Sequence, residues 1–256
     1  MRPENCGILD FYEEKCQKCD YGHKCAIKLT IEHGKEIKIL SGMVGLNIAC
    51  RMQTLLKAKY PNLKVDLDFK GAHECLRMLH PDWGEADFAI VGDISDIQPD
   101  QFNIKEVGKD WLVLVTPPDH PLAKKKEVTI EDVLKYPLIS LSEDYGIATS
   151  VEKALKESGY DEVEPSMVVG DFLLQLNSIS NNLGIGITSM IASLNAYESG
   201  MVEMRPIKDL KDARGVYLIS AFLPSESESM NEYFEFMAEN LEKMFEEFQQ
   251  KYSSLK

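Results

Sequence analysis

The chain has 256 residues, of which 28 are lysine or arginine and 42 are aspartate or glutamate, so its formal net charge at pH 7 is -14. Such an acidic surface repels phosphate backbones and anionic lipids, so we expect no direct DNA binding by this chain and no membrane association. There is no run of 18 apolar residues, and the first residues lack the hydrophobic stretch of a signal peptide. We therefore expect a cytoplasmic protein whose six cysteines are reduced.

Residues 1–35 differ from the rest because they contain four of the six cysteines, Cys6, Cys16, Cys19 and Cys25. In a reducing compartment a C-x2-C pair is typical of metal ligation, because its spacing lets two thiolates face one ion. We expect these four cysteines to bind zinc or an iron–sulfur cluster, between which the spacing does not choose. The alternative is a small helical appendage with reduced cysteines.

After residue 35 the chain alternates between predicted strands and predicted helices. Apolar strands are predicted at 37–40, 65–69 and 86–91, and the helices between them begin near Val44 and Gly71. This βαβαβ order predicts a parallel sheet with helices on its faces.

The middle of the chain contains two strands at 102–107 and 111–115, and the second ends before consecutive prolines. Thr129 and Asp132 have the spacing of a capping box and predict a short helix, which a strand at 138–141 follows.

The second half repeats the alternation. Thr149 and Glu152 predict a capped helix that Gly159 ends, and Asp171 is expected to cap another. The remaining predicted elements are strands at 167–169, 184–188 and 215–222, a helix at 172–179, and a last helix from Ser229. That last helix has a stripe of methionine and phenylalanine, which we interpret as core, and a solvated face rich in glutamate.

Four segments together resemble the effector-binding domain of LysR-type transcriptional regulators. They are KEIKILSGMVG with the following KAKYPNLKVDLDF, GEADFAIVGD, the stretch 111–141, and NNLGIGITSMIA, within a resemblance that covers 36–248. The resemblance implies an α/β fold of two Rossmann-like lobes with a ligand cleft between them, as in type 2 periplasmic binding proteins. We assign 36–115 and 215–256 to lobe I and 116–214 to lobe II.

The sequence departs from the family pattern in three places. The Cys-rich segment stands where the family has a winged helix-turn-helix. Asn182 replaces a usual glycine, and Ser189 a usual proline. Gly71-Ala72 lacks the hydroxyl residue common at that position of the cleft. These departures bear on the ligand and on DNA binding more than on the fold.

Helices in such a fold begin at strand ends that face the cleft, where their free N–H groups favour anions. By resemblance, the ligand-binding residues are Ser41, Gly42, Met43, Gly71, Ala72, His73, Tyr145, Gly146, Thr149 and Asp171. The alternative role for Ser41, Thr149 and Asp171 is helix capping, and His73 is also consistent with an exposed helix residue.

The chain contains no nucleophile elbow, P-loop, H-E-x-x-H or G-x-G-x-x-G motif, so we expect no enzyme. The resemblance implies a ligand-responsive regulator that binds a small anionic metabolite and acts in transcription through a partner. It also implies a homodimer, formed through the first helix and second strand of lobe I. The alternatives are a cytosolic solute-binding protein and a redox sensor that uses the N-terminal cysteines.

Overall fold

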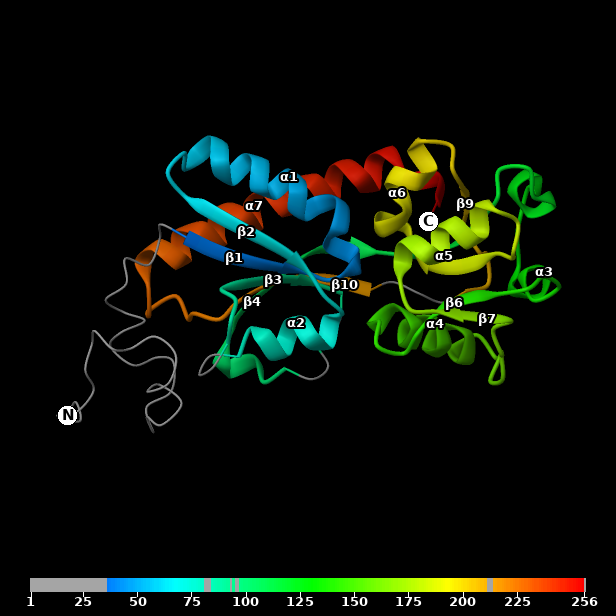
Figure 1. Cartoon of the computed structure of the whole chain (residues 1–256), viewed down its shortest axis with the longest axis horizontal. Coiled ribbons are helices and arrows are strands. Elements are labelled where there is room, and N and C mark those ends of the chain that lie inside the picture. Colours follow the sequence, from blue (N-terminus) through cyan, green and yellow to red (C-terminus); the bar gives the residue numbers. More distant parts are fainter. Residues whose placement is uncertain (1–35, 81–83, 93, 95–96, 211–213, 256) are drawn as a thin grey trace.

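The computed structural model describes residues 36–80, 84–92, 94, 97–210 and 214–255 and divides them between two lobes (Figure 1). Cys6, Cys16, Cys19 and Cys25 lie outside these ranges. Within them, no helix is both long enough and apolar enough to cross a membrane.

The first lobe contains a five-stranded sheet with the strand order β2-β1-β3-β10-β4. β1 is parallel to β2 and β3, as the βαβαβ pattern predicts, whereas β10 is antiparallel to both β3 and β4. The strands are β1 (Glu36–Ser41), β2 (Lys64–Phe69), β3 (Phe88–Val91), β4 (Asn103–Asp110) and β10 (Arg214–Ser220).

Helices cover both faces of this sheet. Figure 1 shows α1 and α7 on one face and α2 on the other. α7 buries its methionine and phenylalanine stripe, as predicted, and packs against β4 at Gly108, where an added Cβ would lie 2.1 Å from Cγ of Phe245. The helices are η2 (Met43–Gly45), α1 (Leu46–Lys59), α2 (Ala72–Met78), η3 (Pro99–Gln101), α7 (Glu228–Lys251) and η5 (Ser253–Leu255).

The second lobe contains a three-stranded antiparallel sheet, β8-β5-β9, and a parallel pair, β6-β7, which a bridge between Leu138 and Ile185 connects to it. α4 lies on one side of these strands and α5 and α6 on the other (Figure 1). The strands are β5 (Leu112–Thr116), β6 (Ile139–Leu141), β7 (Met167–Val169), β8 (Gly186–Ser189) and β9 (Glu203–Arg205). The helices are η4 (Pro121–Lys124), α3 (Ile130–Val133), α4 (Gly146–Glu157), α5 (Phe172–Ser180) and α6 (Met190–Glu198).

The boundary between the sheets lies earlier than the sequence predicts. β5 pairs with β8 and β9, so residues 112–115, which we assigned to lobe I, belong to the second sheet. The apolar run of β5 is equally suited to either sheet, and only its partners decide the assignment. The chain therefore crosses between the lobes at Trp111 and returns between β9 and β10.

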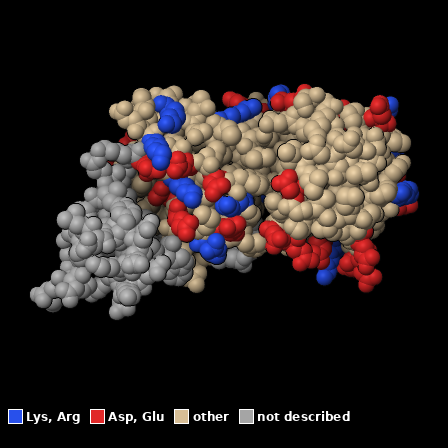
Figure 2. Space-filling model, in the orientation of Figure 1, with Lys and Arg blue, Asp and Glu red and all other residues tan. Residues whose placement is uncertain are grey.

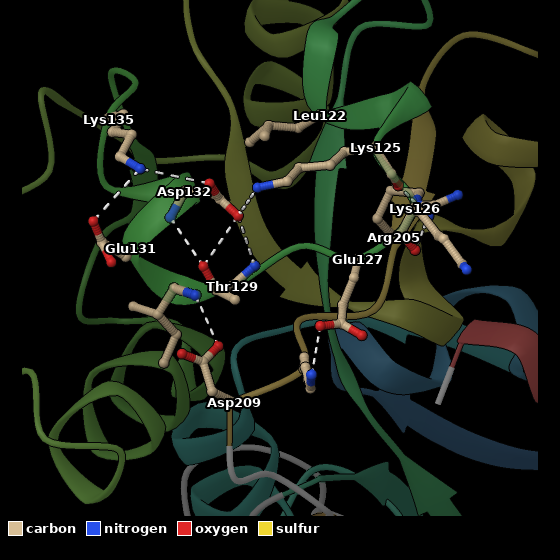
Figure 3. Close-up of polar contacts among 12 residues, drawn as sticks. Leu122, Lys125, Lys126, Glu127, Thr129, Glu131, Asp132, Lys135, Arg205 and Asp209 are labelled. Atoms are coloured by element: carbon tan, nitrogen blue, oxygen red, sulfur yellow. Dashed lines mark hydrogen bonds and ion pairs between the residues drawn. The ribbon is translucent and has the colours of Figure 1, made fainter.

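Two predicted helix caps are confirmed and one is wrong. Thr129 and Asp132 form a reciprocal capping box at the start of α3 (Figure 3), and Asp171 accepts a hydrogen bond of 2.9 Å from the Leu174 N–H. α4 begins at Gly146 after Tyr145, so Thr149 lies inside the helix and caps nothing. Its capping-box spacing to Glu152 occurs where the backbone is already helical.

Candidate ligand-binding cleft

A narrow cleft lies between the lobes, with a cavity of about 30 Å³. This is space for only a few water molecules, so little room remains between the residues that line the cleft. Six of the ten predicted ligand-binding residues line it: Gly42, Met43, Gly71, Ala72, Tyr145 and Gly146. The other lining residues are Val44, Gly92, Ile147, Ser150, Ser189 and Arg214.

The two lobes come into close approach at Gly71. A Cβ added to this residue would lie 2.7 Å from the backbone oxygen of Asp144, which belongs to the second lobe. The glycine that replaces the family's usual hydroxyl residue therefore permits this closed arrangement. A ligand larger than a few waters requires the lobes, or the side chains that line the cleft, to move apart.

Three helices begin at the cleft, and none of them has a side-chain cap. Gly42 precedes η2, which runs directly into α1, while Gly71 precedes α2 and Tyr145 precedes α4. The other α-helices that begin in the described ranges are capped by Thr129, Asp171, Ser189 and Ser227. The first N–H groups of the three uncapped helices are thus not occupied by caps, and an anion is the partner that such groups favour.

Among the described residues that line the cleft, Arg214 provides the cationic side chain. Its Nη2 donates to Oδ2 of Asp110, and its Nη1 lies 3.5 Å from the Ser150 hydroxyl. Its Nε has no hydrogen-bond partner among the described residues, although the side chain is only 12% exposed. The guanidinium therefore retains donor capacity in a desolvated place, which suits a carboxylate or phosphate group.

Asp110 compensates this buried cation and is itself fully enclosed. Its carboxylate accepts from the Ser189 hydroxyl at 2.7 Å and from the Ile191 N–H at 3.1 Å. Ser189 also caps α6 by accepting from the Ala192 N–H at 3.1 Å. Ser189, which replaces a proline usual in the family, therefore connects the ion pair to a helix of the second lobe.

The remaining predicted site residues lie elsewhere. Ser41 is buried, and its hydroxyl donates to the Gly42 carbonyl at 2.9 Å. His73 is exposed on α2, and Asp171 acts as the cap of α5. Thr149 lines a second hollow, on the other side of α4. The structure thus brings six of the ten predicted residues together in the cleft.

The described residues contain no group of three or more His, Cys, Asp or Glu side chains that could hold a metal ion. The predicted metal site falls on the undescribed residues 1–35.

Residues 37–242 match the LysR substrate binding domain family. An uncharacterized HTH-type transcriptional regulator of Methanocaldococcus jannaschii is 30% identical over 183 residues, which are 71% of this chain and 60% of that protein. A probable RuBisCO transcriptional regulator of Emiliania huxleyi is 26% identical over 221 residues, 83% of this chain and 66% of the relative. The chain therefore spans less than two thirds of the length of these two relatives.

Solved structures of similar fold include the CcmR regulatory domain of Synechocystis PCC6803 in complex with 2-PG. It has a TM-score of 0.71 at 17% identity and covers 82% of this chain and 98% of its own. The effector-binding domain of QuiR in complex with shikimate has a TM-score of 0.63 at 19% identity, with 78% and 94% covered. Fold, cleft and family match agree, and the chain belongs to the LysR substrate-binding domain family.

Proposed function

We propose that the protein is a cytoplasmic, non-enzymatic regulator whose cleft binds a small anionic metabolite and which acts in transcription through a partner. The observation that carries the proposal is the Arg214 guanidinium, which faces the cleft with an unpaired Nε beside three uncapped helix starts. The similar domains of CcmR and QuiR bind 2-PG and shikimate, which are small anions.

The position of Arg214 suggests how a ligand would change the arrangement of the lobes. Arg214 begins β10 and Asp110 ends β4, so their ion pair joins the two strands at which the chain crosses between the lobes. Ser150 and Ser189 extend this contact to α4 and α6 of the second lobe. An anion that takes donors of Arg214 therefore acts at the hinge, and its differential affinity for open and closed lobes sets the response.

A thermal-shift screen of carboxylates and phosphates, with 2-PG and shikimate as the first probes, tests this function. A ligand at a hundred times its Kd should stabilise the folded chain by about 2.7 kcal/mol. Arg214→Gln should remove this stabilisation. Arg77→Gln, which changes an exposed arginine on α2 paired with Glu74, is the matched control and should keep it.

A ligand that stabilises the Arg214→Gln variant as much as the unmodified chain would contradict the assignment of Arg214. In a mobility-shift assay, the chain alone should not retard promoter DNA, because its net charge is -14.

We also propose that the protein is a homodimer. An apolar patch is exposed on β7, α5 and the turn that follows α5, and Figure 2 shows a broad face of the second lobe with few charges. The patch consists of Met167, Leu173, Leu174 and Leu183. β2 and β7 are both edge strands, which need protection.

In the dimer, α1 and β2 of one copy would pack against the apolar patch of the other, and two-fold symmetry would form this contact twice. Light scattering should report twice the chain mass of 28.9 kDa. The double substitution Leu173→Glu and Leu174→Glu should give a monomer with an unchanged circular dichroism spectrum. A monomer already in the unmodified chain at micromolar concentration would refute the dimer.

The spacing of Cys6, Cys16, Cys19 and Cys25 supports a further proposal, that these residues bind one zinc ion or one iron–sulfur cluster. Elemental analysis after anaerobic purification should find metal, which Cys16→Ser with Cys19→Ser should remove. A metal-free chain with four freely titrating N-terminal thiols would overturn this proposal.

A further inference from the structure

The second lobe contains a groove that is far larger than the cleft, with a volume of about 560 Å³. It lies between one side of α4, the strands β6 and β7, and the segment 160–165. This volume is within the range of about 300 to 1,000 Å³ that small-molecule sites occupy. Its lining shares no residue with that of the cleft.

The floor of this groove is apolar. Val151 and Leu155 contribute from α4, Val163 from the 160–165 segment and Val168 from β7. Val168 is 58% exposed although it belongs to a strand, so the sheet is not covered by α4 at this point. A ligand that fills the groove would therefore gain apolar contact with the floor.

Among the described residues that line the groove, five are carboxylates at its rim and none is lysine or arginine. They are Glu143, Glu152, Asp161, Glu162 and Glu164, all exposed, and none is in an ion pair with another described residue. Figure 2 shows acidic side chains along the lower edge of this lobe, where Figure 1 places α4. Such a rim repels anions and attracts cations, so the metabolite proposed for the cleft does not fit here.

We propose that this groove binds an organic cation with an apolar body, such as an aromatic or alkyl amine. The apolar part packs on Val151, Leu155 and Val163, while the ammonium group lies among the rim carboxylates. The inference stands apart from the proposed function, because it uses neither the cleft nor Arg214. The two sites attract opposite charges and have no lining residue in common, although α4 and β8 contribute residues to both.

Isothermal titration of the full chain tests the proposal with tryptamine, its neutral analogue N-acetyltryptamine, and spermidine, a cation without a ring. Tryptamine should bind with a Kd below about 1 mM and weaken as salt rises, because exposed charges are screened. N-acetyltryptamine and spermidine should each bind more weakly, since one lacks the charge and the other the apolar body. No saturable binding of tryptamine would overturn the proposal.

Variants locate the binding. Glu152→Gln with Glu162→Gln should weaken tryptamine binding roughly tenfold, the loss expected for two exposed charge contacts. The matched control is Glu157→Gln, also on α4 but outside the groove, which should bind tryptamine unchanged. Ala148→Phe fills the floor and should abolish binding. The two glutamate positions are exposed, so they remain decisive even where Ala148→Phe impairs folding. An unchanged Kd in the double variant would overturn the proposal.

Discussion

Asn182 adopts a left-handed backbone conformation that glycine adopts more readily. α5 ends in a Schellman motif, in which the Asn182 N–H donates to Ile179 at 2.9 Å and the Leu183 N–H to Ser178 at 3.1 Å. Asn182 has φ 61°, and the corresponding residues after α4 and α6 are Gly159 and Gly200, also with positive φ. The family's usual glycine at this position therefore has a conformational reason, which asparagine satisfies less well.

We predict that Asn182→Gly raises the free energy of unfolding by about 0.5–1 kcal/mol, and that Asn182→Ala lowers it by about 1 kcal/mol. Urea denaturation measures both. Asn181→Gly is the matched control, because this neighbouring exposed asparagine has φ -90° and should gain nothing from glycine. A gain of equal size at both positions would contradict the conformational explanation.

Some residues that line the cleft were predicted from the sequence, and others were not. Gly42, Gly71 and Gly146 were predicted by resemblance, because the strand-to-helix turns of the family's fold face its cleft. Arg214 was not, since it stands before an apolar run as an ordinary strand-edge residue, and its partner Asp110 is 104 residues away. Asp110 ends β4 and Arg214 begins β10. The sequence does not show that these two residues meet, because this follows only from the pairing of β4 with β10.

At the scale of elements, the contribution of a helix cap to stability can be tested at two threonines. Thr129 forms the capping box of α3, whereas Thr149 has capping-box spacing but lies inside α4. We predict that Thr129→Ala lowers the free energy of unfolding by about 1 kcal/mol, because it removes the acceptor of the Asp132 N–H. Thr149→Ala should change it by less than about 0.5 kcal/mol, because Thr149 caps nothing. Equal losses in urea denaturation would contradict the observed start of α4.

Asp132 makes the same element sensitive to pH. The Lys125 ammonium and the Thr129 N–H hold the pKa of this carboxyl well below its usual value of 3.8 (Figure 3). A lowered folded-state pKa contributes stability above pH 3.8, which is lost as the pH falls through the folded-state pKa. Asp132→Asn should therefore lose more stability near neutral pH than in acid. If the urea midpoints of the unmodified chain and of Asp132→Asn fall in parallel as the pH is lowered, this prediction is contradicted.

The strength of the periodic pattern decided which elements the sequence predicted. β7 and α5 were predicted almost to the residue, because a short apolar run and an Asp cap mark them. β9 was missed, because its three residues, Glu203–Arg205, include two charged ones and only Met204 is buried. β9 forms because it pairs with the free edge of β5. This pairing depends on the tertiary structure and not on the local sequence of β9.

At the scale of the whole molecule, polar contacts between described residues join the two lobes. Asn47 Nδ2 on α1 donates to the carbonyls of Ile191 at 2.6 Å and Ala192 at 3.1 Å, and Lys251 on α7 pairs with Glu198 at 2.5 Å. The ion pair of Asp110 and Arg214 is the most buried ion pair among the described residues. The charges of this pair are therefore largely shielded from water, unlike those of the exposed ion pairs on the surface.

We predict that Asp110→Asn lowers the free energy of unfolding by about 3 kcal/mol, because it leaves Arg214 buried without its counter-charge. Arg214→Gln should cost a similar amount, whereas the double variant should lose much less than the sum, because neither uncompensated charge remains. Glu127→Gln, which breaks the exposed pair with Lys208, is the control and should cost less than about 1 kcal/mol. Urea denaturation of the unmodified chain, the two single variants and the double variant gives the coupling energy. Additive losses in the double variant would show that Asp110 and Arg214 act independently and that their ion pair does not hold the crossing strands together.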